Sequence, residues 1–315
     1  MSGAQGGGHG VTLAARLARA LKGEDAFTLD EFIQRFWIAA DPAARDRLFE
    51  AFRAHHVGAL VHAVACPETI LVDTRDNFMA RELFVSGAYQ IDTVLEAHRL
   101  LRRERGEGAT DTLFDIGANM GVICVPAVAR GLYRRAIAIE PTPAVARLLR
   151  ANIALNGLEE RIAVHQTALS DAEGEIAFEL SDDNTGDNRI AVESRDNRFR
   201  EHTRRRIVTP MRRFDDLPVA FDPASTLAWI DVQGHEGFVL AGAEKLVGPR
   251  VPLALEIWPY GLDRAGSYDR LMQALARYER FCVLGRDGVF APIAELNALY
   301  DTLRGGTDHA DILVL

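Results

Sequence analysis

A carboxylate followed by a glycine turn is the feature of this sequence with the clearest chemical meaning. Asp115 ends an apolar run, and Gly117, Asn119 and Gly121 follow before a second apolar segment begins. This order is typical of a strand that turns tightly into a helix at a ligand site. Gly117 lets the backbone approach a ligand closely, and Gly121 lets the helix pack on the strand. We expect Asp115 to point into the crevice at the carboxyl end of its strand.

A second acid stands at the end of the next apolar run. Glu140 follows residues 136–139, and an acid at this place can hold the two hydroxyl groups of a ribose. Asp115 would repel a pyrophosphate but suits a cationic amino group. Asn119 interrupts the G-x-G-x-x-G pattern of dinucleotide sites, and no Gly-Lys-Ser/Thr of a P-loop follows. S-adenosylmethionine has a ribose, an ammonium group and no phosphate, so it is the predicted cofactor; a dinucleotide and a turn without ligand stay open as alternatives.

A second polar block follows a later apolar run, residues 226–230. It contains Asp231, His235 and Glu236, and a further apolar run carries Glu256 near its end. Strand four of a doubly wound sheet lies beside strand one across the switch point, so Asp231 is expected to face the same crevice as the first turn. Four acids at or near the ends of successive strands are hard to explain by solubility alone.

The second block supplies the candidates for a catalytic base. A histidine beside two carboxylates has its pKa set by them and could remove a proton. His235 could equally cap or orient a neighbouring helix. The catalytic candidates are therefore Asp231, His235, Glu236 and Glu256, with no choice made among them.

Four blocks of the chain resemble the FkbM-type methyltransferases in order and spacing. They are Asp115-Ile-Gly-Ala-Asn-Met-Gly121, Ile139-Glu-Pro-Thr-Pro143, Ala168-Leu-Ser-Asp171 with Gly174, and Ile230-Asp-Val-Gln-Gly-His-Glu236 with Val239-Leu-Ala-Gly-Ala243. The resemblance covers residues 68–259. It implies an S-adenosylmethionine-dependent enzyme with a Rossmann-like class I α/β fold, a mostly parallel seven-stranded sheet with helices on both faces. Many members methylate hydroxyl groups, so the implied acceptor is a hydroxyl on a small molecule or sugar.

The resemblance also implies which residues contact the cofactor. Its amino-acid portion would be held by the first turn, that is by Asp115, Gly117, Asn119 and Gly121. The ribose would be held at Glu140 and Pro141, and the adenine edge by the backbone near Ala168. One position departs from the family pattern. Gln233 stands where the middle acid of Asp-x-Glu-Gly-x-Glu is usual, which removes an anionic ligand, so we expect no metal ion at this block.

Alternating apolar runs and amphipathic segments predict the elements that carry these residues. Strands are expected near 112–115, 136–139, 162–165, 227–230 and 252–256, with helices at 121–130, 143–155 and 236–247. Such alternation implies a parallel sheet with helices on both faces. A strand at 69–73 and a helix at 92–103 are expected ahead of it, and a helix at 268–279 with closing strands at 281–284 and 311–315 behind it.

The chain is expected to divide into three parts. Residues 1–10 hold five glycines and are expected to be disordered, 11–66 form a helical module, and 67–315 form the methyltransferase domain. Asp41 and Pro42 supply a cap and a first-turn proline for one helix of the module. The module could act as a lid, a dimerisation element or a packing appendage, so a homodimer stays open.

An arginine-rich stretch, residues 181–213, contrasts with the acidic chain around it. It holds nine arginines and six acids, including the run Arg204-Arg205-Arg206. The run could attract a phosphate or carboxylate on a substrate. The favoured interpretation is a solvated loop or an edge strand that its charge keeps unpaired.

Composition argues against several classes of protein. The net charge of −9 disfavours a nucleic-acid binder, which needs a basic field. Three widely spaced cysteines suit a reducing compartment and offer no disulfide or zinc pattern. No apolar run approaches the ~18 residues of a membrane span, and no leader opens the chain, so a cytoplasmic protein without a membrane partner is expected. The rival functions are a non-catalytic sensor of S-adenosylmethionine and a nicotinamide-dependent oxidoreductase, the latter weakened by Asn119.

Overall fold

The computed structural model describes residues 41–55, 58–63, 65–193, 198–304, 306 and 308–315. The expected disordered tail, 1–10, and most of the expected helical module, 11–66, lie outside these residues. Within the module, the helix expected after Asp41 is α3 (Pro42–His55). The Asp41 carboxylate accepts a hydrogen bond of 2.6 Å from the Ala44 N–H, so this residue acts as the cap that the sequence predicts.

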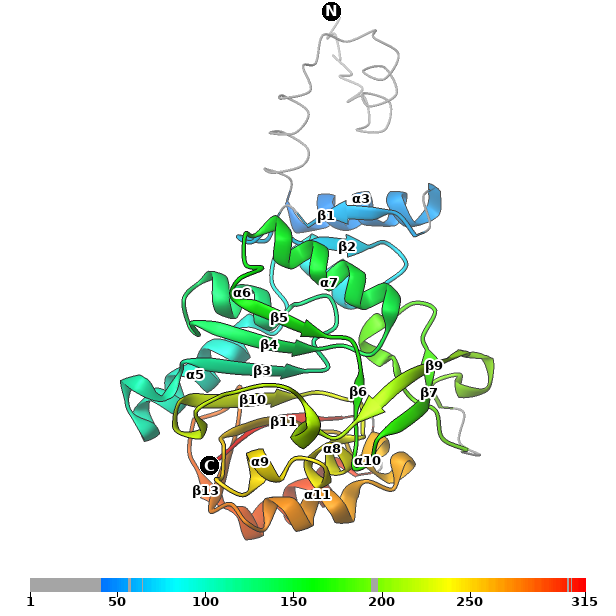
Figure 1. The fold of residues 1–315 in the computed structure, drawn as a ribbon. Helices are drawn as coiled ribbons and strands as arrows, with labels where there is room; N and C mark the ends of the chain where they lie inside the picture. The colour runs from blue at the N-terminus through cyan, green and yellow to red at the C-terminus, as the bar shows by residue number, and fades with distance from the viewer. Residues whose placement is uncertain (1–40, 56–57, 64, 194–197, 305, 307) are drawn as a thin grey trace, which may run out of the picture.

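A mixed eight-stranded sheet forms the centre of the molecule, in the order β13-β12-β14-β11-β10-β3-β4-β5 (Figure 1). The five consecutive parallel strands are β3 (Thr112–Ile116), β4 (Arg135–Ile139), β5 (Ile162–His165), β10 (Thr226–Ile230) and β11 (Leu253–Ile257). The other three are β12 (Arg280–Val283), β13 (Ala291–Pro292) and β14 (Ala310–Val314). β14 runs antiparallel to both β11 and β12.

The Rossmann-like class I fold with helices on both faces is therefore confirmed, and its strand count needs one correction. Seven strands were expected, and β13 is an eighth, which pairs with β12 through two residues only. A pairing this short, ending in Pro292, has no periodic pattern that sequence analysis can detect.

Two hydrophobic clusters pack against opposite faces of the sheet. Side chains along a strand alternate between them: Leu113 belongs to one cluster, and Phe114 belongs to the other. The first face is covered by α5 (Ile91–Arg105), α6 (Cys124–Ala129) and α7 (Pro143–Leu155), next to α4 (Met79–Ser86). The second is covered by α8 (Glu236–Ala241), α9 (Glu244–Val247), α11 (Tyr268–Leu275) and α12 (Leu296–Leu303), with α10 (Pro259–Ala265) beside them.

The helix expected over 236–247 is two helices, α8 and α9, separated at Gly242. A Cβ on Gly242 would lie 2.0 Å from the Ser170 carbonyl oxygen, so a segment distant in sequence packs against the backbone at this point. The expected helix 121–130 begins only at Cys124, and the expected helix 268–279 ends at Leu275.

A second, four-stranded sheet with the order β6-β9-β7-β8 covers the carboxyl ends of the central strands (Figure 1). Its strands are β6 (Ala168–Leu169), β7 (Gly174–Leu180), β8 (Arg189–Ile190) and β9 (Arg205–Arg212). A separate antiparallel pair, β1 (Leu60–His62) with β2 (Leu71–Asp73), packs near α7. Among the described helices, none has the length and apolarity needed to cross a membrane.

Candidate functional site

Asp115 lies inside β3 and is 1% exposed. Its carboxylate accepts a hydrogen bond of 3.0 Å from the Cys124 N–H, which fixes the start of α6 relative to the strand. Burial raises the pKa of Asp115 to about 6, and the nearby Asp231 charge also raises it. The acid is therefore held rigidly at the switch point, between the β3 turn and the residue that follows β10.

The glycine turn passes directly against that neighbouring strand. Gly117 has φ = 93°, and a Cβ there would lie 1.8 Å from the Asp231 carbonyl oxygen. A Cβ on Gly121 would lie 2.8 Å from side-chain atoms of Val125 and Leu149, so this glycine allows α6 and α7 to approach the turn. Both glycines are required by close contact, as their positions in the sequence predict.

Glu140 follows β4 and points back over the glycine turn. One carboxylate oxygen accepts the Thr142 N–H at 2.7 Å, and the other accepts the Asn119 N–H at 3.1 Å. Burial raises the pKa of Glu140 to about 7. A carboxylate has about four acceptor sites, so two remain for a pair of hydroxyl groups.

These residues line one cavity, which we call the inner chamber. Its walls include Asp115, Gly117, Asn119, Glu140 and Pro141. Its volume is about 60 Å³, so side chains must move before a nucleoside can enter. Gly121 and Ala168 do not line it: Gly121 acts through packing, and Ala168 lies in β6 of the second sheet.

A larger cavity, the outer chamber, has a volume of about 520 Å³. It opens between the second sheet and the ends of β10 and β11, and its lining includes Tyr89, Glu256, Trp258 and His309. The two chambers have five lining residues in common, namely Met79, Gln90, Gly186, Asp231 and Gln233. The chambers are therefore neighbours, and Asp231 and Gln233 form their boundary.

At this boundary Gln233 connects two acids. Its amide nitrogen donates to Asp231 Oδ1 at 2.8 Å and to Glu256 Oε2 at 3.2 Å. Burial raises the pKa of Asp231, and burial together with the Asp231 charge raises that of Glu256 well above its ordinary value. An acid at position 233 could not donate these bonds while ionised, so the departure from the family pattern stabilises two neighbouring carboxyl groups.

His235 lies outside both chambers. Its ring nitrogen Nε2 is 2.9 Å from Ser170 Oγ, and its ring stacks on Phe238 at 4.4 Å between centroids. Burial lowers its pKa to about 4. These contacts fit the alternative that His235 orients neighbouring segments, and the role of His235 as a base stays a prediction.

Glu236 also lines neither chamber. Its Oε1 accepts the Val232 N–H at 3.1 Å and the Gly234 N–H at 3.2 Å. Burial raises its pKa to about 7. Glu236 therefore shapes the 232–234 loop, and the candidates that reach a cavity are Asp231 and Glu256.

The arginine-rich stretch differs from the favoured interpretation of a solvated loop. Arg189 is fully buried and pairs with Asp187 at 2.8 Å and Glu201 at 2.6 Å. Arg204 is buried against Asp187. Asp187 is close to Arg189 in the sequence, but the Glu201–Arg189 and Asp187–Arg204 pairs join residues 12 and 17 positions apart, which the sequence pattern does not predict.

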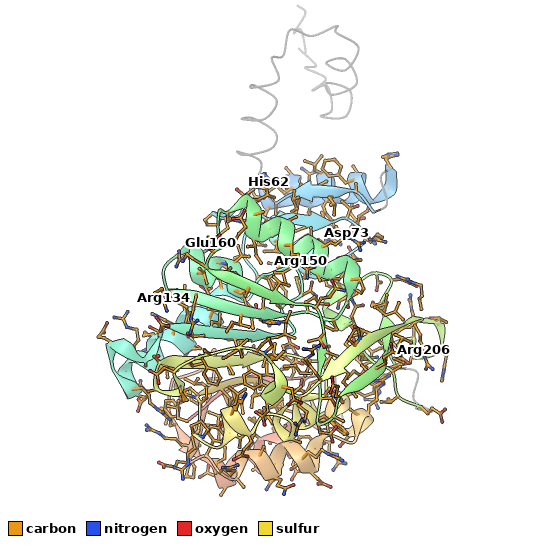
Figure 2. All side chains as sticks on the ribbon, in the orientation of Figure 1. His62, Asp73, Arg134, Arg150, Glu160 and Arg206 are labelled. Carbon is orange, nitrogen blue, oxygen red and sulfur yellow. The ribbon has the colours of Figure 1, made fainter. Side chains whose placement is uncertain are left out.

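The Arg204-Arg205-Arg206 run is not an open anion site along its whole length. Arg206 pairs with Glu179 at 2.8 Å and lies on β9, at the side of the molecule where the central strands end (Figure 2). With Arg204 paired as well, only Arg205 of the three has no ion pair among the described residues.

Several lining residues carry no signal in the sequence. Gln90 adopts φ = 53° just before α5, and Met79 begins α4. Tyr89 and His309 reach the outer chamber from loops that precede α5 and β14. A lone polar or aromatic residue in a loop becomes a site residue only through the tertiary fold.

The family model of the methyltransferase FkbM domain matches residues 115–277, and the chain belongs to this family. The match contains all four blocks that carry the resemblance in sequence, so the predicted family is confirmed. No curated protein matches the chain.

Solved structures similar to the chain are methyltransferases, at low identity. A putative tRNA (m1A22) methyltransferase of Streptococcus pneumoniae has a TM-score of 0.32 and 15% identity, covering 65% of this chain and 63% of that chain. TYW2 of P. horikoshii, in complex with MeSAdo, has a TM-score of 0.37 and 11% identity, covering 95% of this chain and 98% of that chain. An O-methyltransferase of Bacillus cereus, in complex with SAH, has a TM-score of 0.36 and 16% identity, covering 70% of this chain and 80% of that chain.

The chain spans just under two thirds of the length of the Streptococcus pneumoniae protein. The expectation that this chain has no nucleic-acid partner stays a prediction.

Proposed function

We propose that this chain is an S-adenosylmethionine-dependent methyltransferase, with 67–315 as its catalytic domain, that methylates a hydroxyl group of a small molecule or sugar. The observation that carries the proposal is the arrangement of two neighbouring chambers that meet at Asp231 and Gln233. The inner chamber has carboxylates that could bind the hydroxyl and ammonium groups of a nucleoside with an amino-acid tail. The outer chamber is large enough for a second substrate.

The residues of the inner chamber fit the cofactor in chemical type. Glu140 offers free acceptor sites to ribose hydroxyls, and Asp115 is an acid at the place where an ammonium group would lie. The cradle around Gly117 has no room for a side chain. A pyrophosphate at the glycine turn would meet the Asp115 carboxylate, which disfavours a nicotinamide dinucleotide.

S-adenosylmethionine, when bound, supplies a methyl group on a positively charged sulfur that is already a good leaving group. The residues of the chain then have two tasks, which are to align the acceptor oxygen and to remove its proton. Asp231 lies where the chambers meet, and Glu256 lines the outer chamber beside it. Burial raises the pKa of both carboxyl groups, which makes each a stronger base than an exposed carboxylate.

The direct test is incubation of the full chain with methyl-labelled cofactor and a panel of hydroxyl compounds, including sugars and polyketide alcohols. We expect label in a hydroxyl compound and release of the demethylated cofactor. A parallel arm with tRNA checks the opposite substrate class. Tight cofactor binding without demethylated product in any arm would favour the sensor alternative.

Metal independence is part of the same proposal. Among the described residues, no group of three or more His, Cys, Asp or Glu is arranged to hold a metal ion. We expect turnover to persist in EDTA. Loss on chelation that magnesium or manganese restores, and zinc does not, would instead make Asp231 and Glu256 metal ligands.

A further inference from the structure

His309 lies at the rim of the outer chamber, in the loop just before β14. Its Nε2 is 3.9 Å from Glu256 Oε1. The imidazole side chain is 52% exposed, whereas the Glu256 side chain is 10% exposed. His309 thus lies between a mostly enclosed carboxyl group of the chamber and solvent.

A buried base needs such a connection. Each methyl transfer to a hydroxyl group releases one proton, and a carboxyl group whose pKa is raised well above its ordinary value keeps that proton. The other oxygen of Glu256 already accepts the Gln233 amide, which has no proton-accepting capacity. The next turnover must wait until the proton leaves Glu256.

The other titratable groups around Glu256 are poor routes for the proton to solvent. Glu236 is a buried acid with a raised pKa that lines neither chamber. Asp231, in the loop after β10, and Asp311, opposite Glu256 in the β11–β14 register, are themselves buried acids with raised pKa values. Burial also raises the pKa of Tyr89, in the loop before α5. Asp187 adds further negative charge near Glu256, but it is ion-paired with Arg189.

We propose that His309 accepts the proton from Glu256 after each methyl transfer and passes it to bulk water. The inference rests on the proposed function. In the balanced step, the acceptor O–H bond breaks and its proton moves to the Glu256 carboxylate. The oxygen forms the new bond to the methyl group as the carbon–sulfur bond breaks, with the bonding pair left on sulfur. The proton then passes from Glu256 to Nε2 of neutral His309 and on to buffer.

An imidazole suits this role because one ring nitrogen can accept a proton while the other donates one. Nε2 of His309 and Oε1 of Glu256 are 3.9 Å apart. A small side-chain rotation would bring them within hydrogen-bond distance, or one water molecule could connect them. His309 is a positioning residue for the proton, acting through Glu256, and has no expected contact with the cofactor.

The test compares His309→Ala and His309→Gln with the full wild-type chain, using labelled cofactor. The matched control is His55→Gln, which removes an exposed histidine at the end of α3 that lines neither chamber. We expect kcat to fall at least ~10-fold in both His309 variants, with unchanged cofactor affinity and acceptor KM. The kcat–pH profile should differ from that of the wild-type chain, and added imidazole should restore turnover in His309→Ala.

A double variant separates a proton relay from a general structural role. If His309 acts through Glu256, adding His309→Ala to Glu256→Gln should cause no further loss of kcat. Wild-type-like kcat and pH profile in His309→Ala would overturn the relay while leaving the proposed function intact. An equal loss without imidazole rescue would overturn it too. Absence of methyl transfer by the wild-type chain would instead refute the proposed function and the relay together.

Discussion

At the scale of single residues, carboxyl groups are buried where a charged cofactor and a proton acceptor are needed. Asp115 and Glu140 are held by backbone N–H groups, and Asp231 and Glu256 by the Gln233 amide. Each therefore has a fixed orientation before any ligand binds, which reduces the ordering cost of binding.

Glu140→Ala should weaken binding of S-adenosylmethionine by about 1.5–3 kcal/mol, because a hydrogen bond to a charged acceptor is lost at each ribose hydroxyl. Calorimetry should give wild-type binding near 1 μM, roughly −8 kcal/mol, with NAD far weaker. Glu160→Ala is the control, since this exposed acid lies before β5, away from the chambers (Figure 2). Equal affinity of both variants would exclude Glu140 from the pocket.

Asp231→Asn and Glu256→Gln should each lower turnover at least ~100-fold with little change in cofactor affinity, the scale of a lost general base. His235→Ala tests the two roles that are open for this histidine: if it orients neighbouring segments, the variant should lower the melting temperature through lost packing on Phe238 and leave the acceptor chemistry in place. Steady-state kinetics with labelled cofactor separates these cases. A chemical defect confined to His235→Ala would support the role of the histidine as a base.

At the scale of elements, the β3 turn and the loop after β10 position the site by touching each other. The sequence predicts both turns correctly because an apolar run that ends in an acid or glycine is a local signal. Their mutual contact, between Gly117 and the Asp231 carbonyl, is a long-range fact of strand order.

Gly117→Ala and Gly131→Ala form a matched pair at this scale. Both glycines have positive φ, at 93° and 73°, but a Cβ at 131 would meet nothing within 4 Å. We expect Gly131→Ala to cost about 1 kcal/mol of unfolding free energy. Gly117→Ala should cost clearly more and abolish cofactor binding, because the backbone at Asp231 must shift. Equal costs in denaturant titrations would show that the contact is unimportant.

At the scale of the whole molecule, burial of several acids ties stability to pH. The raised pKa values of Asp115, Glu140, Glu236, Asp231, Glu256 and Asp311 mean that the folded state binds more protons than the unfolded state above the ordinary carboxyl range. The contribution of these groups to the free energy of unfolding is therefore greatest at low pH, and it declines as pH rises through their folded-state pKa values. His235, with its lowered pKa, acts in the opposite sense below its ordinary value near 6.5.

His62, His98 and His165 also have lowered pKa values and act in the same sense as His235. Because six acids outnumber these four histidines, the melting temperature of the ligand-free protein should fall as pH rises from about 5 to about 8. Scanning calorimetry across this range checks the slope. Glu236→Gln should flatten it, since the amide keeps an oxygen for the Val232 and Gly234 N–H groups but does not titrate. A melting temperature that rises with pH would mean that the acids are not buried as the fold requires.

The sequence by itself determined the family and the order of strands and helices, and it proposed Asp115, Glu140, Asp231 and Glu256 as site residues from a local pattern at each strand end. Only the tertiary structure showed that Gln233 joins two acids, that His235 and Glu236 contact neighbouring segments away from both chambers, and that Tyr89 and His309 reach the outer chamber. The physical reason is the distance along the chain over which each kind of interaction acts. Hydrophobic periodicity and glycine turns act over a few neighbouring residues, whereas burial, ion pairing and cavity shape depend on strand order and on the second sheet, which bring together segments far apart in the chain.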